Sequence, residues 1–365
     1  MKQGWEIKKL GEVCSINYGT RVVQKKDGGT IFPVYGGGGA TFRMDKYNRE
    51  DCLVVSRFAM SSQCVRYVVG KFFLNDSGLT IETNSPKLKQ SFLDKHIIAY
   101  NDKIYSLGKG AAQRNLDIKA LKEVSINYPS IVEQEKIVAE LDCLSGIIEK
   151  KKQQLKELDN LAQSIFYEMF GEHADGRDKW KIAKLGNVCK TTSGGTPSKG
   201  HPEYYEGGDI PWLRSGEVNK INIHQTELFI TEEGLNNSSA KWFPKGTVVI
   251  AMYGATVGQV GILCNPMTTN QAICGIFPNE TFTPIYLYHF LLSKKPEYLE
   301  IATGGAQANI SQNIVRDTVV SCPPLTLQQD FASKIESIEK QKELIAKSIR
   351  ETETLFNSSM DYYFN

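Results

Sequence analysis

The residue types that carry out chemistry are present in this sequence, but their spacing matches none of the familiar catalytic motifs. The phosphate-binding pattern Gly-x-x-x-x-Gly-Lys-Ser/Thr is absent, and the glycine run 36–39 lacks the Lys and the helix that would follow such a loop. Amino-group methylation needs a motif such as Asn-Pro-Pro-aromatic, which the Asn-Pro-Met at 265–267 does not satisfy. A nuclease site built on Pro-Asp and Glu-x-Lys fails because the chain has no Pro-Asp dipeptide. We therefore expect a chain without a catalytic site; an enzyme with an unfamiliar site is the alternative.

Histidine and cysteine give no better case for chemistry. The five histidines form no repeated His/Asp/Ser grouping, so a catalytic triad is not expected. The eight cysteines include no Cys-x-x-Cys pair and no His at metal-ligand spacing, which argues against zinc. Scattered cysteines are typical of buried thiols in a reducing compartment, so the sequence predicts a cytoplasmic protein.

Length and charge restrict the class further. A chain of 365 residues with 41% hydrophobic residues suggests two or three globular domains. No apolar run approaches the roughly 20 residues that cross a membrane, and residues 1–11 are too charged for a signal peptide. The net charge is only +2, but residues 20–71 hold nine basic and four acidic side chains. Such a patch is suited to DNA phosphates, although a plain solvated face explains it equally well.

The elements that would position these residues are duplicated. Residues 5–14 return at 180–189, shifted by 175, and residues 52–56 correspond to 247–251, shifted by 195. The second copy therefore carries about 20 extra residues, which we expect near 201–222. The period is far longer than the 20–50 residues of a solenoid repeat, so a whole domain with its tail has been duplicated. The copies differ most in their middle parts, which indicates two similar modules of different specificity; drift after duplication is the alternative.

Each copy is expected to be strand-rich with mixed α and β structure. Residues 53–56 and 246–251 are typical of buried strands, and residues 284–292 are typical of a helix. The tetrapeptide at 17–20 resembles Ser-Gly-Gly-Thr at 193–196. We expect the glycine run 36–39 to form a flexible loop after a strand.

Both tails predict long helices. Apolar residues recur with heptad spacing for more than four heptads. The predicted seam consists of Ile137, Leu141, Leu144, Ile148, Leu155, Leu158 and Ile165 in the first tail, and of Phe331, Ile335, Ile338, Ile345, Ile349 and Phe356 in the second. Because each apolar stripe needs a partner, the connectivity favours an antiparallel coiled coil between the two tails, with the two domains related by a pseudo-two-fold axis.

The predicted fold is therefore α+β, with two similar strand-rich globular domains separated by two long helices. The predicted boundaries are 1–128 for the first domain, 129–172 for the first helix, 173–179 for a linker, 180–322 for the second domain and 323–365 for the second helix. A helix of about 37 residues is roughly 55 Å long at 1.5 Å per residue. Two DNA-reading modules on one face of a duplex must be at least about one helical turn apart, ~34 Å, which a helix of this length permits.

Several motifs resemble one known family. Each copy opens with Trp-x-x-x-x-Leu-Gly-x-Val, and each long helix follows Pro-x-x-x-x-Gln. The second copy contains Ser-Gly-Gly-Thr-Pro at 193–197, Ile-Pro-Trp-Leu-Arg-Ser-Gly-Glu at 210–217, Tyr-Gly-Ala-Thr-Val-Gly at 253–258, Asn-Gln-Ala at 270–272 and Gln-Ala-Asn-Ile at 307–310. In this order, and over the whole chain, they resemble the specificity (S) subunits of type I restriction–modification systems. The first copy departs from the pattern in its middle, where it lacks the Pro-Trp-Leu-Arg-Ser-Gly-Glu stretch.

The resemblance implies a DNA-recognition subunit without catalytic activity. Each target-recognition domain would read one half of a bipartite, asymmetric site on double-stranded DNA. The helices would set the spacing and dock two methyltransferase (M) subunits, joined in some systems by two restriction (R) subunits. S-adenosylmethionine, ATP and Mg²⁺ are then expected in those partners only. A methylation-only system and a coiled-coil scaffold that binds proteins or glycans are the alternative readings.

Candidate DNA contacts are polar and basic side chains in loops, where phosphate contacts position a protein and base-edge contacts specify the sequence. In the second domain the candidates are Thr196, Ser198, Lys199, Arg214, Ser215, Tyr253 and Gln307. In the first domain they are Thr20, Arg21, Lys25, Lys26, Arg43 and Arg57. Arg214 is the best candidate for reading a base, because its guanidinium fits guanine O6 and N7; a structural ion pair is the alternative. We expect Trp212 to be a core residue.

Overall fold

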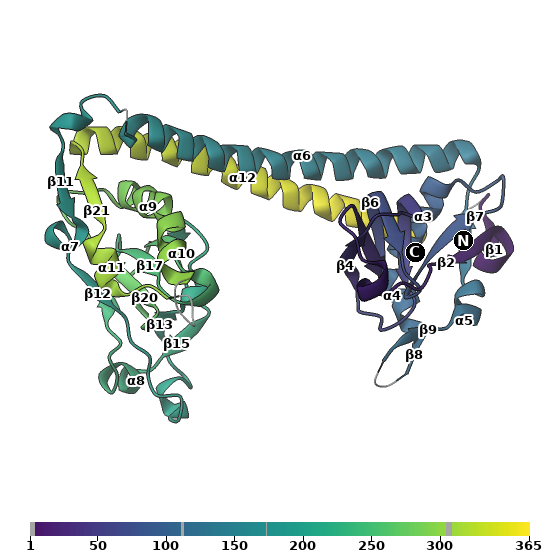
Figure 1. The fold of residues 1–365 in the computed structure, drawn as a ribbon, viewed down its shortest axis with the longest axis horizontal. Helices are drawn as coiled ribbons and strands as arrows, with labels where there is room; N and C mark the ends of the chain where they lie inside the picture. The colour runs from purple at the N-terminus through teal and green to yellow at the C-terminus, as the bar shows by residue number, and fades with distance from the viewer. Residues whose placement is uncertain (1–3, 111–112, 173, 304–308) are drawn as a thin grey trace. The chain divides into compact units, whose positions relative to one another are not determined.

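The computed structural model describes residues 4–110, 113–172, 174–303 and 309–365, which form two compact units (Figure 1). Unit 1 consists of Met1–Gln153 and Ala346–Asn365, and unit 2 consists of Gln154–Ile345. Two 40-residue helices, α6 (Ile131–Phe170) and α12 (Leu325–Phe364), each contribute to both units. The two ends of each long helix therefore pack on different globular domains.

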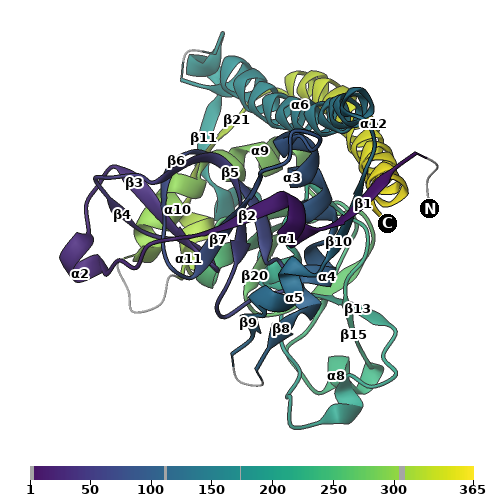
Figure 2. The same cartoon turned by 90° about the vertical axis from the view of Figure 1, so that its right-hand side faces the viewer.

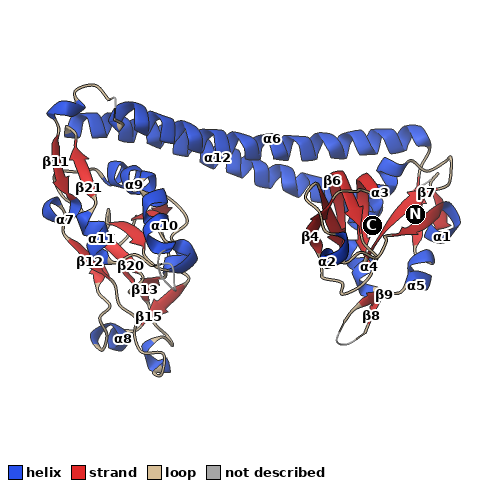
Figure 3. Ribbon diagram, in the orientation of Figure 1, coloured by secondary structure: helices blue, strands red, loops and turns tan. Residues whose placement is uncertain are grey.

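Unit 1 is built around a six-stranded sheet (Figure 3). Its strand order is β2 (Cys14–Tyr18), β7 (Gly78–Thr83), β5 (Arg49–Ser56), β6 (Val65–Leu74), β3 (Phe32–Gly36) and β4 (Gly39–Met44). The neighbours pair antiparallel except for β3 and β6, which are parallel. The remaining elements are α1 (Leu10–Val13), α2 (Gln24–Asp27), α3 (Gln90–Ala99), α4 (Asn101–Ser106), β8 (Gly108–Lys109), β9 (Asn115–Leu116) and α5 (Ile118–Lys122).

Unit 2 contains two sheets. The five-stranded sheet has the order β12 (Thr191–Ser193), β20 (Ile273–Ile276), β17 (Val248–Ala251), β18 (Val260–Leu263) and β14 (Asn222–Ile223). The four-stranded sheet has the order β15 (Leu228–Ile230), β13 (Ile210–Leu213), β19 (Met267–Thr269) and β16 (Trp242–Phe243). The helices are α7 (Leu185–Val188), α8 (Glu232–Asn236), α9 (Pro284–Ser293), α10 (Lys295–Thr303) and α11 (Gln312–Asp317), with 3-10 turns at Arg177–Lys179, Pro202–Tyr204, Ser215–Glu217 and Gly254–Thr256.

Each globular domain is closed by pairing between its first and last strands. In unit 1, β1 (Glu6–Lys9) pairs antiparallel with β10 (Ser125–Tyr128). In unit 2, β11 (Lys181–Lys184) pairs in the same way with β21 (Val319–Cys322). The strand that precedes each long helix therefore lies beside the duplicated segment that opens the domain.

The long helices pair antiparallel in both units. In unit 1, Glu140 of α6 accepts hydrogen bonds from Ser359 and Tyr363 of α12, whereas Lys151 donates to Thr352 at 3.4 Å and also contacts Ser348. In unit 2, Lys342 pairs with Asp159 at 2.7 Å, and the rings of Phe331 and Phe166 lie 5.7 Å apart. Residue numbers rise along α6 while those of their partners fall along α12, so the pairing is antiparallel.

The thirteen predicted seam residues are all at least half-buried. Ile137, Leu141, Ile148, Phe331, Ile335, Ile338 and Ile349 are buried, and Leu144, Leu155, Leu158, Ile165, Ile345 and Phe356 are half-buried. The heptad pattern did not indicate that the helix ends enter the domain cores. Phe166 and Phe170 join the core of unit 2, and Met360 and Phe364 join the core of unit 1.

One helix of each domain mediates this packing. In unit 1, α3 lies between the sheet and the long helices (Figure 2). Phe92 of α3 packs on Phe364 of α12 with 5.3 Å between the ring centroids. In unit 2, Tyr286 of α9 packs on Phe170 at 4.9 Å. The start of α6 and the end of α12 pack in the core of unit 1, while the end of α6 and the start of α12 pack in the core of unit 2. The internal contacts of the chain are therefore pseudo-symmetric, with the two helices exchanging roles.

A buried glutamine fastens each long helix to its domain. Gln134 accepts a hydrogen bond from the Lys89 amide at 2.9 Å and donates to the carbonyls of Lys87 and Pro129, both at 2.8 Å. Gln328 makes the corresponding three bonds in unit 2, to the Thr283 amide and to the carbonyls of Thr281 and Pro323. Both glutamines are fully buried. The Gln of the Pro-x-x-x-x-Gln motif thus satisfies backbone groups that no water can reach.

Candidate nucleic-acid interface

In unit 2, four segments of the chain that are far apart in sequence meet at the ends of β12, β13, β17 and β19. The Asn270 amide donates to the Leu213 carbonyl at 2.9 Å, and the Gly195 amide donates to the Thr269 carbonyl at 2.9 Å. The Met252 amide donates to the Ala272 carbonyl at 2.8 Å. These bonds bring the Ser-Gly-Gly-Thr, Leu-Arg-Ser-Gly, Met-Tyr-Gly and Asn-Gln-Ala segments together, so most of the candidate residues of the second domain lie in one loop cluster.

Arg214 follows β13 in this cluster and is held by two carboxylates. Its Nε lies 3.2 Å from Glu217 Oε1, and its Nη2 lies 2.6 Å from Glu227 Oε2. Glu217 also accepts from the backbone amides of Arg214 at 3.2 Å and of Glu227 at 2.7 Å. The side chain of Arg214 remains 41% exposed. The structure therefore contains the ion pair that was the alternative for this residue, and it leaves part of the guanidinium open to a ligand.

The other candidates of the second domain differ in exposure. Thr196 is half-buried and hydrogen-bonds to Gln271, whereas Ser198 and Lys199 are exposed on the loop that follows. Ser215 is half-buried beside Arg214, and the Tyr253 ring is 40% exposed. Trp212 is buried and donates to the Gly195 carbonyl at 3.0 Å, so it is a core residue as expected. Gln307 lies outside the described residues.

The first domain repeats this convergence with the same backbone bonds. The Gly19 amide donates to the Gly78 carbonyl as the Gly194 amide does to Ile273, and the Asn75 amide donates to Tyr35 as Asn270 does to Leu213. A side chain at Gly19 would lie 1.9 Å from the Asn75 carbonyl oxygen, and one at Gly194 would lie 2.1 Å from Thr269, so both positions require glycine.

These bonds correct the alignment of the two copies. They pair Gly19 with Gly194 and therefore Thr20 with Gly195 rather than with Thr196. They also equate Tyr35 with Leu213, which places most of the extra length of the second copy after β13, between Arg214 and Val248. The extra residues were expected near 201–222; they form the loop after β13 together with β14, β15, α8 and β16.

The glycine run 36–39 stands where the second copy has Arg214 to Glu217. The prediction of a flexible loop was wrong, because the run forms the tight turn between β3 and β4 and is held by side chains. The Gly37 carbonyl accepts from Ser56 Oγ at 2.6 Å and from Arg66 Nη2 at 2.7 Å, and its amide donates to Ser77 Oγ at 3.0 Å. Arg66, which the sequence did not single out, thus supplies a guanidinium from a neighbouring strand.

Arg57 lies between two aromatic rings at the same edge of unit 1. Its guanidinium carbon is 4.6 Å from the Tyr18 ring centroid and 4.5 Å from the Phe58 ring centroid. The Leu116 amide donates to the Arg57 carbonyl as the Ile310 amide does to Met252, so Phe58 occupies the place of Tyr253. Ala59 has φ 47° where Gly254 has φ 65°, which supports this correspondence. Phe58 is 36% exposed and was not among the candidates, although the shift of 195 residues already placed it opposite Tyr253.

The remaining candidates of the first domain lie in the loop after β2, on α2 and on β4. Thr20 is exposed, and its amide donates to the Leu74 carbonyl at 2.9 Å. Arg21 is exposed, and Lys25 and Lys26 are exposed on α2. Arg43 lies on β4 and donates to the Ile31 carbonyl at 2.6 Å. Thr20 and Arg57 belong to the loop cluster, whereas Lys25, Lys26 and Arg43 surround the β3–β4 hairpin.

The described residues also bear on metal binding, thiol chemistry and membrane insertion. No group of three His, Cys, Asp or Glu side chains among them is placed to hold a metal ion. All eight cysteines are free thiols, and burial raises the pKa of Cys14, Cys189 and Cys274 to about 12. Across the described ranges, no helix combines the length and apolar character needed to span a membrane.

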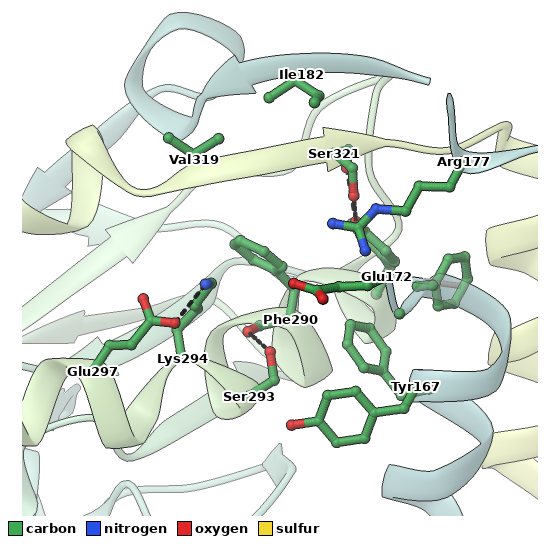
Figure 4. A pocket seen from close by; sticks show the side chains of 14 residues that line it. Tyr167, Glu172, Arg177, Ile182, Phe290, Ser293, Lys294, Glu297, Val319 and Ser321 are labelled. Atoms are coloured by element: carbon green, nitrogen blue, oxygen red, sulfur yellow. Dashed lines mark hydrogen bonds and ion pairs between the residues drawn. The ribbon is translucent and has the colours of Figure 1, made fainter. Parts of the chain in front are cut away.

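A cavity of about 340 Å³ lies in unit 2 beside the end of α6 (Figure 4). Aromatic rings from α6 and α9 line it, including Tyr167 and Phe290, and Lys294 at its edge pairs with Glu297 at 2.6 Å. The Tyr286 hydroxyl donates to the Ser321 carbonyl at 2.7 Å. No candidate DNA contact contributes to this cavity, so we assign it to the packing of the helix on the domain.

Two recognition modules of one design, joined through paired long helices, define a class of DNA specificity proteins. Residues 2–160 and 177–354 match the family described as the type I restriction modification DNA specificity domain. The chain belongs to this family.

Individual relatives agree with this assignment. The chain is 27% identical over 194 residues to the specificity subunit of the Escherichia coli type I restriction enzyme EcoR124I/EcoR124II, covering 52% of this chain and 48% of the relative. It is 32% identical over 180 residues to the specificity subunit of the Methanocaldococcus jannaschii enzyme MjaIX, covering 46% and 41%. The chain thus spans somewhat less than half the length of these curated relatives.

Solved structures share the fold over the whole chain. The type I restriction–modification S subunit from M. genitalium has a TM-score of 0.60 at 16% identity, covering 99% of this chain and 96% of that one. A chain from a study of complex assembly and conformational transition of the type I restriction–modification system has a TM-score of 0.63 at 19% identity, covering 100% and 98%. At these identities the likeness establishes the fold: two strand-rich domains and two long helices.

Proposed function

We propose that this chain is the DNA-recognition subunit of a type I restriction–modification complex and that each globular domain reads one half of a bipartite, asymmetric site. One observation carries the proposal. The same four segments converge at one edge of both domains through equivalent backbone bonds, yet the side chains displayed there differ. A common scaffold with different polar groups is what two half-sites of unlike sequence require.

We further propose that the two helices set the spacing of the half-sites and dock two methyltransferase subunits, joined by restriction subunits where the system has them. Large apolar side chains remain exposed on the helices outside the seam. Leu161 and Leu344 in unit 2 are 47% and 69% exposed, and Leu355 in unit 1 is 55% exposed. Partner helices would cover such residues.

The proposal assigns no reaction to this chain. S-adenosylmethionine, ATP and Mg²⁺ would bind to the partner subunits, which would act on DNA in the cytoplasm. The chain would contribute Arg214, Ser215, Tyr253 and their neighbours in the second domain, and Arg57 with its two aromatic rings in the first, as groups that contact the duplex.

Reconstitution tests the proposal. The purified chain, its cognate methyltransferase subunit and the mixture of both are assayed for adenine methylation of plasmid DNA. We expect activity only in the mixture, confined to one split motif. Methylation by the chain alone would favour the enzyme alternative. Methylation by the partner alone, with a motif that does not depend on this chain, would favour the scaffold alternative.

A further inference from the structure

We propose that Arg214 and Glu227 together read a single G·C base pair in the half-site of the second domain. The inference rests on the proposed function of that domain and assigns one element of its specificity to a pair of oppositely charged side chains. It also gives the half-buried Glu217 a positioning role.

Glu217 fixes the direction of the Arg214 side chain. Its Oε1 lies 3.2 Å from both the backbone nitrogen and Nε of Arg214, and its Oε2 accepts from the Glu227 amide at 2.7 Å. The Glu217 side chain is only 11% exposed, so water competes little for these bonds. One carboxylate therefore orients the guanidinium and also anchors the start of the segment that carries Glu227.

Glu227 is placed differently. Its Oε2 lies 2.6 Å from Nη2 of Arg214, but its side chain is 71% exposed. An exposed pair of this kind is held weakly and rearranges easily, so the Arg214 fork can open toward a ligand while Glu227 stays beside it. Two carboxylates around one guanidinium also leave an excess negative charge, which repels a phosphate but not an uncharged base edge.

The two groups match the major-groove edge of a G·C pair. Guanine offers O6 and N7 as adjacent acceptors for the Arg fork, and cytosine offers its N4 amino group as a donor to a carboxylate. An A·T pair in the same place would set the adenine N6 amino group against the guanidinium and thymine O4 against the carboxylate. Both contacts would then be lost or repulsive, so the pair discriminates at both bases.

The surroundings suit a base-edge contact and are specific to the second domain. Glu217 and Glu227 line a cavity of about 600 Å³ within residues 216–227, whose other lining residues include Asn219, Asn222 and Gln225. In unit 1 the position of Arg214 is taken by Gly36, within the turn between β3 and β4. We therefore expect this G·C contact in one half-site only.

The test uses the full chain assembled with its cognate methyltransferase subunit. After the methylated motif has been mapped, each base pair of the second half-site is replaced in turn, and binding and methylation rates are measured for wild type, R214K and E227A. R214K keeps the charge but loses the fork. The matched control is D317N, which removes an exposed carboxylate that pairs with Lys184 at 2.9 Å and lies on α11, outside the loop cluster and the long helices.

For wild type and D317N we expect one G·C position at which replacement lowers the rate roughly 5- to 150-fold. In R214K and E227A the penalty at that position should shrink, with the penalties at the other positions retained. For each variant, the affinities for the replaced sites are measured at a salt concentration at which binding is detectable. A variant that binds weakly therefore still yields a penalty at each position of the half-site.

Three results would overturn the inference: a second half-site without a G·C pair, unchanged penalties in both variants, or an equal fall of the penalties at every position. The last result would indicate a phosphate contact or support of the loop. Failure of the proposed function itself looks different, because wild type would then show no defined second half-site.

Discussion

The recognition edges of the two units share a backbone and differ in how an arginine reaches them. In unit 2, Arg214 belongs to the loop itself, directly after β13, and carboxylates hold it in place. In unit 1 the corresponding residues are glycines; Arg66 enters the edge from β6, and Arg57 comes from the loop that follows β5. The comparison teaches that the backbone bonds define the site, while the strand that supplies the charged group is free to change.

The junctions with the long helices show the same relation. The buried glutamine is retained in both units with the same three bonds. The apolar contacts around it have diverged: a shift of 194 residues equates Phe331 and Phe166 of unit 2 with Ile137 and Met360 of unit 1. Polar bonds to the backbone are thus retained where apolar packing has been exchanged, and this difference can be tested residue by residue.

The largest effect is expected from truncation of the aromatic junction. Phe331 is fully buried and packs on Phe166, Phe170 and His289. F331A should lower the unfolding free energy of unit 2 by about 3–5 kcal/mol, and I137A should cost unit 1 about 1 kcal/mol less, since a smaller cavity forms. Native-state hydrogen exchange reports each unit separately. Equal losses in both units, or a loss in the wrong unit, would show that the junctions are not organised as described.

The two glutamines should respond alike. Q328L leaves the Thr283 amide and two carbonyls without partners in a buried place, and Q134L does the same in unit 1. Each should cost its own unit about 2–4 kcal/mol. The control Q329A alters an exposed neighbour and should stay near wild type. Denaturant unfolding followed by hydrogen exchange at peptide resolution measures the unfolding free energy of each unit. A loss below about 1 kcal/mol in either variant would contradict the three hydrogen bonds assigned to that glutamine.

Positions 94 and 95 on α3 correspond to 288 and 289 on α9, but the buried ionisable residue differs: it is Asp94 in unit 1 and His289 in unit 2. The stability of the two units should therefore respond to acid in opposite directions. Burial raises the pKa of Asp94 to about 6, against the opposing Gln90 bond and Lys95 charge. Folded unit 1 then holds a proton that the unfolded chain releases, so its stability falls as pH rises from about 4 to 6. Burial, assisted by the Lys342 charge, lowers the pKa of His289 to about 4. Unfolded unit 2 therefore takes up a proton first, and stability is lost as pH falls from about 6.5 to 4.

Each contribution should amount to about 1–3 kcal/mol across its pH range. D94N should remove the dependence in unit 1, and H289F, which keeps an aromatic ring of similar size, should remove it in unit 2. Hydrogen exchange at a series of pH values, corrected for intrinsic rates, measures both. The idea fails if both units weaken together on acidification and neither substitution changes the profile.

The smallest effect concerns the basic patch of unit 1. Lys25 and Lys26 are exposed on α2 and are placed for phosphate contact rather than base reading. K25Q and K26Q should each reduce the slope of log affinity against log salt by up to about one, equally for all DNA sequences. The control K340Q on α12 should leave the slope unchanged. A change in the recognised bases, without a change in slope, would mean that these lysines read sequence.

Periodicity and repetition in the sequence indicated the α+β class, the duplication and the long helices. They indicate these features because heptad spacing and repeated motifs are local signals that need no tertiary information. The tight turn formed by the glycine run 36–39 could not be predicted from the sequence. It is held by Ser56, Arg66 and Ser77, which come from three other segments. Phe58 was missed for a different reason: the shift of 195 residues placed it opposite Tyr253, but only polar and basic side chains were taken as candidates in the first domain.

Arg214 illustrates the boundary between the two kinds of information. Its type and its place after a buried Trp marked it as a base reader, with an ion pair as the alternative, and Glu217 lies only three residues away. Glu227 lies 13 residues after Arg214, within the segment that is longer in the second copy. No local sequence pattern connects the two residues. The pair on which the inferred specificity depends therefore required a structure.

Long-read mapping of methylated adenine tests the central claim most directly. Cells express the cognate methyltransferase subunit with either the wild-type chain or a chain in which residues 191–321 are replaced by the matching segment of another specificity subunit. We predict a split motif that depends on this chain, with one half altered by the exchange and the other half unchanged. A motif that forms without the chain, or one in which both halves change together, would contradict the assignment of one half-site to each domain.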